Sequence, residues 1–384
     1  MNQKINKVTP FAVSGISLLL TSGMSVNATL PYIKEHLSLN QTQSELLSTI
    51  PSLTVVTFLL LSTRIINKIG MKKTVLIGLI LVAVGGVLPA FTPDSYKLIL
   101  VSRLMLGAGL GMYVSSAVNY INELFVGKQR MTLLGIRNSM ESIGQMILTF
   151  VAGILLGFGW QFSFLVYLFA IPVGILFYFF VPDVKIDKVV SEKKVKIKAL
   201  PLLTFFFASI MVMNSIAIAV RFPTLAIDLK GPGYNPSNYL ALMPVLGIIA
   251  GFLFQKLAST LKYRILYLAV FINLVANLFI ALSYQSFLLL VIGLLISSIP
   301  VAWVLPFIFN HIERIASGMP TRFLTSFIFL GCNFGVLTAP LVMQGMTYFG
   351  GTSNLYFPFY IFTIIFGILL VCLILLRKKL TKTL

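Results

Sequence analysis

Twelve long apolar stretches account for nearly the whole of this 384-residue chain. Each is close to the roughly 20 residues that a helix needs to cross a bilayer. Because a backbone in hydrocarbon must satisfy its own hydrogen bonds, apolar runs of this length predict helices and not strands. We therefore expect an all-α integral membrane protein with spans near residues 10–32, 44–65, 74–92, 98–122, 132–157, 162–181, 201–226, 238–257, 265–283, 286–309, 323–347 and 355–376.

Charge is scarce and unevenly placed. Charged residues make up 10% of the chain, against about 25% in soluble proteins. If both termini are cytoplasmic, most of the 29 lysines and arginines fall on the cytoplasmic side, which is the bias that orients membrane proteins. The net charge of +19 then indicates lipid headgroups rather than nucleic acid as a partner, in a bacterial inner membrane. The exceptions are Lys34, Lys97 and Lys230 outside, and Arg103, Arg137 and Arg221 within spans.

One charged segment, Pro182–Ala199, separates six predicted spans from the next six. It predicts an N-terminal six-helix bundle at 1–181, a cytoplasmic linker at 182–199 and a C-terminal six-helix bundle at 200–384. The polar residues Met1–Thr9 resemble the start of a signal peptide. The apolar run that follows is too long for one, so a retained first helix is expected over a cleaved signal.

The two halves resemble each other weakly. Pro31 near the end of span one precedes Pro51 of span two, as Pro223 near the end of span seven precedes Pro244 of span eight. Repeated halves are typical of secondary transporters, whose binding site is expected near the midplane between the repeats. Spans five and eleven also match through Ser139 and Gly144 in one half and Ser326 and Gly331 in the other.

The loop between spans two and three runs from Thr63 to Lys73 and resembles the G-x-x-x-D-R-x-G-R-R signature of the major facilitator superfamily. Gly70 permits a tight turn between antiparallel helices. Asn67 replaces the aspartate of the family and Thr63 its first glycine, so the aspartate's charge network is not expected here. A basic turn without further function is the alternative. The conformational loop motif comprises Asn67, Lys68, Gly70, Lys72 and Lys73.

Span four carries Arg103 followed by Gly107, Gly109 and Gly111, which is similar to the second motif of the same family. An arginine inside a span is costly and needs a partner or water. The glycines allow a neighbouring helix to approach closely. Arg103 therefore either takes part in proton coupling or gating, or extends to the outer interface near Lys97.

This resemblance implies two six-helix bundles around a central cavity that exchange access by rocking. It also implies that an ion gradient, commonly of protons, drives transport.

Span five contains a candidate coupling pair. Arg137 and Glu141 are four residues apart, so they share a helix face and can form an ion pair. A carboxylate within a span is most often part of a proton relay, although a static ion pair is the alternative. Asn138 and Gln145 are candidate substrate-cavity residues on the same helix. The Gly-Pro signature that drug/proton antiporters carry here is incomplete, because Gln145 stands in the proline position.

The second half offers fewer polar candidates for the cavity. Arg221 near the end of span seven occupies the repeat position of Thr29 and would suit an anionic group, or serve as an interfacial anchor. Asn214 and Asn333 are further candidates for the substrate cavity. Asn333 has the alternative of bonding to a neighbouring helix.

Enzymatic signatures are not apparent in this sequence. We find no phosphate-binding loop, zinc-protease motif or nucleophile elbow. Cys332 and Cys372 lie in apolar spans and have no metal-ligand spacing. No cofactor or metal is therefore predicted. The sequence favours a monomeric transporter that exports a small organic solute by proton-coupled alternating access. Uptake or exchange of a small anion is the main alternative, followed by a membrane sensor or a membrane-embedded enzyme.

Overall fold

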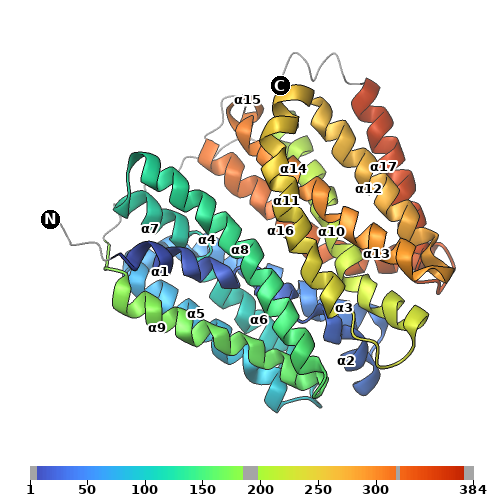
Figure 1. Cartoon of the computed structure of the whole chain (residues 1–384), viewed down its shortest axis with the longest axis horizontal. Helices are drawn as coiled ribbons and strands as arrows, with labels where there is room; N and C mark the ends of the chain where they lie inside the picture. Colours follow the sequence, from blue (N-terminus) through green and yellow to red (C-terminus); the bar gives the residue numbers. More distant parts are fainter. Residues whose placement is uncertain (1–6, 185–197, 317–320, 376–384) are drawn as a thin grey trace. The chain divides into compact units, whose positions relative to one another are not determined.

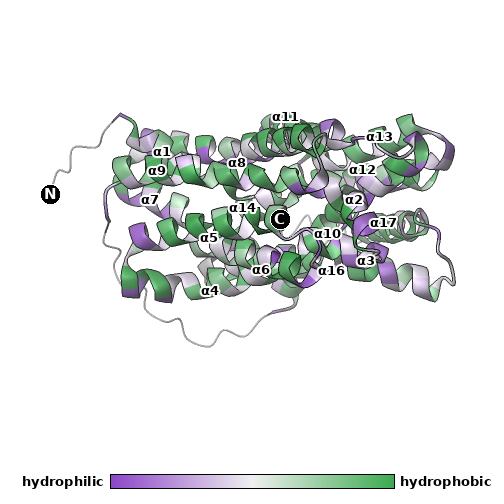
Figure 2. Ribbon diagram, turned by 90° about the horizontal axis from the view of Figure 1, so that it is seen from below, coloured by the Kyte–Doolittle hydropathy of each residue, from purple (hydrophilic) through white to green (hydrophobic). Residues whose placement is uncertain are grey.

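The computed structural model describes residues 7–184, 198–316 and 321–375. Within these ranges, twelve helical segments are long and apolar enough to cross a membrane, as predicted (Figure 1). Hydrophobic residues cover most of each helix, and hydrophilic residues are concentrated near helix ends and loops (Figure 2). Two compact units divide the chain, Met1–Ser191 and Glu192–Leu384. Residues 185–197 of the predicted linker at 182–199 lie outside the part of the chain that the structure describes.

The N-terminal unit contains the first six spans, several of which consist of more than one helix. In chain order its elements are α1 (Thr9–Gly15), η1 (Ile16–Leu19), η2 (Ser22–Met24), η3 (Asn27–Thr29), α2 (Leu30–His36), α3 (Gln41–Thr49), α4 (Pro51–Ile69), α5 (Met71–Phe91), α6 (Tyr96–Tyr113), α7 (Ser116–Leu124), α8 (Gly127–Leu156), η4 (Trp160–Phe169) and α9 (Ala170–Phe180).

The first span is irregular in its middle, where short 3₁₀ turns replace the α-helix between Ile16 and Thr29. This segment is rich in serine, threonine and asparagine, whose side chains compete for backbone hydrogen bonds. It also contains Gly23, which has no side chain and leaves the backbone flexible. The loosened turns expose backbone carbonyls to neighbouring helices, and the hydroxyl of Tyr167 donates to the carbonyl of Ser22 at 2.9 Å. The sequence predicts one continuous helix here, and the structure differs from that prediction.

Glycines in span four allow the close helix contacts that the sequence predicts. The α-carbon of Gly107 lies so near the carbonyl of Pro51 on α4 that an added Cβ would overlap it. On the other side, a Cβ at Gly109 would approach the carbonyl of Gly78 on α5 to 2.5 Å. Close backbone approach of this kind gives membrane helices much of their packing energy, and it places α6 firmly between α4 and α5.

The C-terminal unit contains the other six spans. Its longest helices, α10 and α16, pack along each other, and α12 packs against α17. The elements are α10 (Ala199–Lys230), α11 (Ser237–Leu261), α12 (Arg264–Ala281), η5 (Ser283–Gln285), α13 (Phe287–Ile296), α14 (Ser298–Asn310), α15 (Ile312–Ala316), α16 (Thr321–Phe349) and α17 (Phe357–Leu375).

Candidate functional site

An ion pair lies within span five of the N-terminal unit. Arg137 Nη1 is 2.9 Å from Glu141 Oε2, one helical turn away on α8, as their spacing predicts. The two side chains are 14% and 31% exposed. Thr21 of the broken first span donates its hydroxyl to the backbone carbonyl of Glu141 at 3.3 Å. The carboxylate-bearing turn of α8 is thus attached to the irregular part of span one.

Further polar groups extend this cluster along α8. Arg137 Nη1 also donates to Asn138 Oδ1 at 2.9 Å, and Asn138 is exposed. Gln145 is half-buried one turn beyond Glu141, so Arg137, Glu141 and Gln145 follow one another on the same helix face. The structure therefore brings together four of the residues that the sequence singled out in span five.

Packing beside this cluster is tight. An added Cβ at Gly144 would overlap the backbone carbonyl of Leu18, so α8 touches span one directly at this turn. The cluster is therefore next to a fixed helix–helix contact.

Arg103 lies in a different environment, fully inside the N-terminal unit and 1% exposed. Its Nη1 donates to the hydroxyl of Tyr167 at 3.0 Å. Its Nη2 donates to the carbonyl of Gly86 at 3.2 Å and to the hydroxyl of Ser102 at 3.3 Å. These partners are neutral. The alternative that Arg103 extends to the outer interface is wrong, because its side chain points into the bundle.

Aromatic rings complete the surroundings of Arg103. Its guanidinium carbon is 4.8 Å from the centre of the Phe164 ring and 5.0 Å from that of Tyr167, both on η4. Stacking of this kind stabilises a buried cation without a carboxylate. Since Tyr167 also donates to the carbonyl of Ser22, a chain of hydrogen bonds connects spans four, six and one.

Sequence reasoning missed Tyr167. It belongs to no motif, and tyrosine is common in membrane spans. Its position 64 residues from Arg103 and 145 from Ser22 means that only helix packing brings the three together.

Polar candidates in the C-terminal unit have partners of their own. Arg221 is 2% exposed, and its Nη1 donates to the carbonyl of Leu355 in the segment before α17 at 3.0 Å. The side chain is thus attached to the segment between α16 and α17, and its role as an anion contact or as an interfacial anchor stays a prediction. Asn333 is half-buried and donates to the carbonyl of Phe329 on its own helix at 3.0 Å, so the bond to a neighbouring helix is not the one observed.

Asn214 belongs to a buried amide cluster between α10 and α12. Its Nδ2 donates to Asn273 Oδ1 at 3.3 Å, and Asn277 Nδ2 donates to the carbonyl of Asn273 at 2.7 Å. All three side chains are fully buried. Asn214 is therefore directed into the C-terminal unit rather than towards its surface, and it holds α10 against α12.

The loop between spans two and three has the geometry that its sequence predicts. Gly70 has a φ of +88°, which glycine adopts without strain, and it joins α4 to α5. Asn67 and Lys68 are exposed at the end of α4. At the beginning of α5, Lys72 lies over the ring of Tyr178 with its Nζ 5.3 Å from the ring centre. Within the described residues, no cluster of three histidine, cysteine or acidic side chains is arranged to hold a metal ion.

Comparison with known proteins identifies relatives of this chain. The family model described as Major Facilitator Superfamily matches residues 12–319. The uncharacterized MFS-type transporter EfpA of Mycobacterium tuberculosis is 29% identical over 167 residues, 43% of this chain and 31% of that protein. The hexuronate transporter of Bacillus subtilis is 24% identical over 259 residues, 62% of this chain and 60% of that protein. The chain spans less than two thirds of the length of either relative.

Solved structures share the fold. The POT family transporter PepTSo superposes with a TM-score of 0.77 at 12% identity, over 98% of this chain and 99% of that one. A peptide transporter POT in complex with alafosfalin also has a TM-score of 0.77, at 14% identity over 95% of this chain and 93% of that one. At such low identity the likeness concerns the fold alone.

Proposed function

The chain belongs to the major facilitator superfamily and is a membrane transporter, not an enzyme, and from this premise we propose that it exports a small organic solute in exchange for protons. The observation that carries the proposal is the Arg137–Glu141 ion pair within span five. A carboxylate within a membrane span is a functional candidate by default, and proton relay is one of its main uses. Glu141 is the proposed proton carrier, and Arg137 is its counter-charge.

Protonation of Glu141 would change the contacts of this turn. The charged form pairs with Arg137, whereas the neutral form loses the Coulomb attraction and leaves Arg137 with Asn138. Thr21 and Gly144 attach the same turn of α8 to span one. Each protonation state then favours a different packing of spans one and five, which is what coupling of a proton to alternating access requires.

The internal repeat supports a functional role for the pair. Counting back from Gly331 as from Gly144, the positions equivalent to Arg137 and Glu141 are Leu324 and Ile328. Both are fully buried apolar residues of α16. The C-terminal unit therefore packs this helix face with apolar side chains alone. Because the same packing would serve the N-terminal unit, the Arg137–Glu141 pair is not needed to hold the helices together, which favours a functional role.

The roles of the remaining residues follow from their positions. We assign Arg103 to the positioning of spans one, four and six through Tyr167. Asn138 and Gln145 are the proposed solute contacts next to the pair, with Arg221 and Asn333 in the second unit. Asn214 is not proposed as a contact, because its fully buried side chain holds α10 against α12. The distribution of lysine and arginine supports cytoplasmic termini. The protein is proposed to be a monomer in a bacterial inner membrane.

The test is transport by the purified protein in liposomes that contain a pH-sensitive dye. An imposed proton gradient should collapse when a transported member of a panel of organic cations, neutral amphiphiles and carboxylates is added. Glu141→Gln should abolish this gradient-driven transport and retain solute counterflow, because the neutral side chain still allows the rocking motion.

Glu123→Gln is the matched control, since Glu123 is an exposed glutamate at the end of α7. It should transport like the wild type. Gradient-driven transport that persists in Glu141→Gln would refute the coupling role of Glu141.

A second function, uptake or exchange of a small anion, is favoured by the buried arginines. Arg103 has only neutral partners among its hydrogen bonds, and Arg221 is fully inside the C-terminal unit. One relative is named as a transporter of hexuronate, which is a carboxylate. Guanidinium groups bind carboxylates through paired hydrogen bonds, so these arginines would suit such a solute.

Labelled hexuronate distinguishes the two functions. Anion uptake predicts saturable accumulation, with a raised half-saturating concentration in Arg221→Ala and a smaller change in Arg221→Lys. Arg314→Ala, which changes an exposed arginine on α15, is the control. Transport of a cation or neutral solute that is indifferent to Arg221→Ala would exclude this second function.

A further inference from the structure

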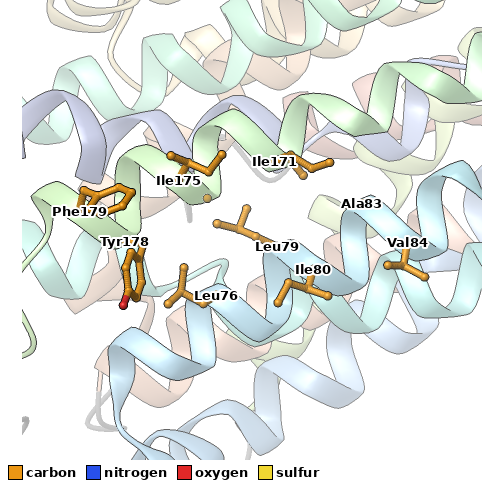
Figure 3. A pocket seen from close by; sticks show the side chains of 11 residues that line it. Leu76, Leu79, Ile80, Ala83, Val84, Ile171, Ile175, Tyr178 and Phe179 are labelled. Carbon is orange, nitrogen blue, oxygen red and sulfur yellow. The ribbon is translucent and has the colours of Figure 1, made fainter.

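A hollow of about 480 Å³ lies on the surface of the N-terminal unit between α5 and α9 (Figure 3). Its floor is formed by small or buried residues where the two helices meet, and its rim by large exposed ones. The floor comprises Leu79, Ala83, Ala170 and Gly174, and the rim comprises Ile80, Val84, Ile171, Ile175 and Phe179.

Small residues create this hollow. An added Cβ at Gly174 would reach ordinary contact distance, 3.7 Å, from the Cδ1 of Leu79, so a side chain longer than alanine at this position would extend into the hollow. The lining runs along α5 from Leu76 to Val84, which corresponds to about 12 Å at the rise of an α-helix. An elongated apolar hollow of this kind fits part of an extended hydrocarbon chain.

The positively charged side chain of Lys72 lies at one end of the hollow. Tyr178 lines that end, close to Leu76 and Phe179 (Figure 3). The ammonium group of Lys72 lies over the ring of Tyr178, 5.3 Å from its centre. This cation–π contact holds Lys72 beside the end of the hollow. Lys73 follows in the same first turn of α5 and is exposed.

The surroundings of this end are mainly basic. Arg64 and Lys68 are exposed near the end of α4, six and two residues before Gly70. The carboxylate of Asp183 lies about 4.0 Å from a Cβ built on Gly70 and partly offsets them. Basic residues at the membrane surface attract anionic lipid headgroups.

We propose that the hollow binds a glycerophospholipid with an anionic headgroup, with one acyl chain between α5 and α9 and the phosphate at Lys72. The lining offers a transported solute no charged group and only the Tyr178 hydroxyl as a polar one, which favours a hydrocarbon chain over a polar solute. The lipid phosphate would form an ion pair with the ammonium group of Lys72 at the end of the hollow. The bound lipid would bridge α9 and α5, the helix that begins within the loop motif.

The experiment is lipid titration of the purified full-length protein in detergent, read by native mass spectrometry and by thermal stability. Phosphatidylglycerol should be retained as one tightly held copy and should raise the melting temperature. Phosphatidylcholine and soluble glycerol phosphate should do neither, because one lacks the net charge and the other lacks the chain.

Two variants address the two parts of the site. Lys72→Gln should raise the half-saturating phosphatidylglycerol concentration about fivefold, the effect of one lysine at an anionic surface, and Lys72→Arg should retain binding. Gly174→Leu should fill the hollow and displace the lipid. Lys128→Gln and Gly135→Leu are matched controls, since Lys128 is an exposed lysine in the first turn of α8 and Gly135 has open space around its α-carbon.

The remaining outcomes overturn the proposal. Equal retention of both lipids with no effect of either variant would mean ordinary annular lipid only. A loss in Lys72→Gln but not in Gly174→Leu would mean a surface phosphate contact without a chain site. A loss in Gly174→Leu alone would mean a chain site without headgroup selection. The melting temperature of each lipid-free variant shows whether it is folded.

Discussion

Gly144 of α8 lies directly against the backbone carbonyl of Leu18 in the broken first span. The same relationship recurs in the second unit, where Gly331 of α16 lies against the backbone of Phe205 on α10. The two glycines are as far apart in the sequence as their two partners. The weak internal repeat therefore corresponds to a repeated helix contact, between the first and fifth spans of each half.

Gly144→Ala is expected to destabilise the protein. Its Cβ would overlap the Leu18 carbonyl, which is backbone and cannot swing away, so we expect a cost of about 1–3 kcal/mol from overpacking. Gly135→Ala on the same helix has nothing nearby and should be neutral or stabilising by up to about 1 kcal/mol. Thermal unfolding in detergent measures both. Equal melting temperatures would contradict the close contact.

Tyr167→Phe should weaken the N-terminal unit, because it removes the acceptor of Arg103 Nη1 and the donor to the Ser22 carbonyl. Hydrogen bonds between membrane helices contribute about 0.6 kcal/mol on average and up to about 1.7. The loss of two should lower the melting temperature measurably. Tyr348→Phe, at an exposed tyrosine of α16, is the control and should have no effect.

Replacing both members of the ion pair should be better tolerated than replacing one. Glu141→Ile alone leaves the half-buried Arg137 without its counter-charge, and we expect a cost of about 1 kcal/mol or more. The double variant Arg137→Leu/Glu141→Ile copies Leu324 and Ile328 of the other half and should recover most of the lost stability. It should also lack gradient-driven transport. A double variant less stable than Glu141→Ile would show that the pair is required for folding.

The amide cluster of the C-terminal unit should respond in a similar way. Asn273→Leu removes the acceptor of Asn214 and leaves that fully buried amide without its partner on α12. We expect a cost of about 0.6–1.7 kcal/mol, read as a lower melting temperature. The double variant Asn214→Leu/Asn273→Leu removes both amides and should restore part of the stability that Asn273→Leu loses. Asn333→Leu, which breaks a bond within one helix, should have little effect.

Sequence alone predicted the number of spans, the fold class and the ion pair. These are properties of short segments: a run of apolar residues must be helical in a bilayer, and residues four apart on a helix must be neighbours. The turn at Gly70 is equally local, because only its own φ and the adjacent helix ends are involved. The family assignment, first suggested by the loop from Thr63 to Lys73, is confirmed by the match over residues 12–319.

Only the tertiary structure decided what the buried arginines contact. Arg103 and Arg221 could each have pointed towards the interface or into a bundle, since nothing in their own helices distinguishes the two directions. The partner of Arg221 is 134 residues away, and that of Arg103 is 64. The hollow between α5 and α9 arises in the same way, whereas the turns of span one follow from the local composition of that segment. An apolar segment forms a membrane helix because of its own burial in hydrocarbon, which is a local property. The face that this helix presents to its neighbours depends on packing between segments that are distant in the sequence.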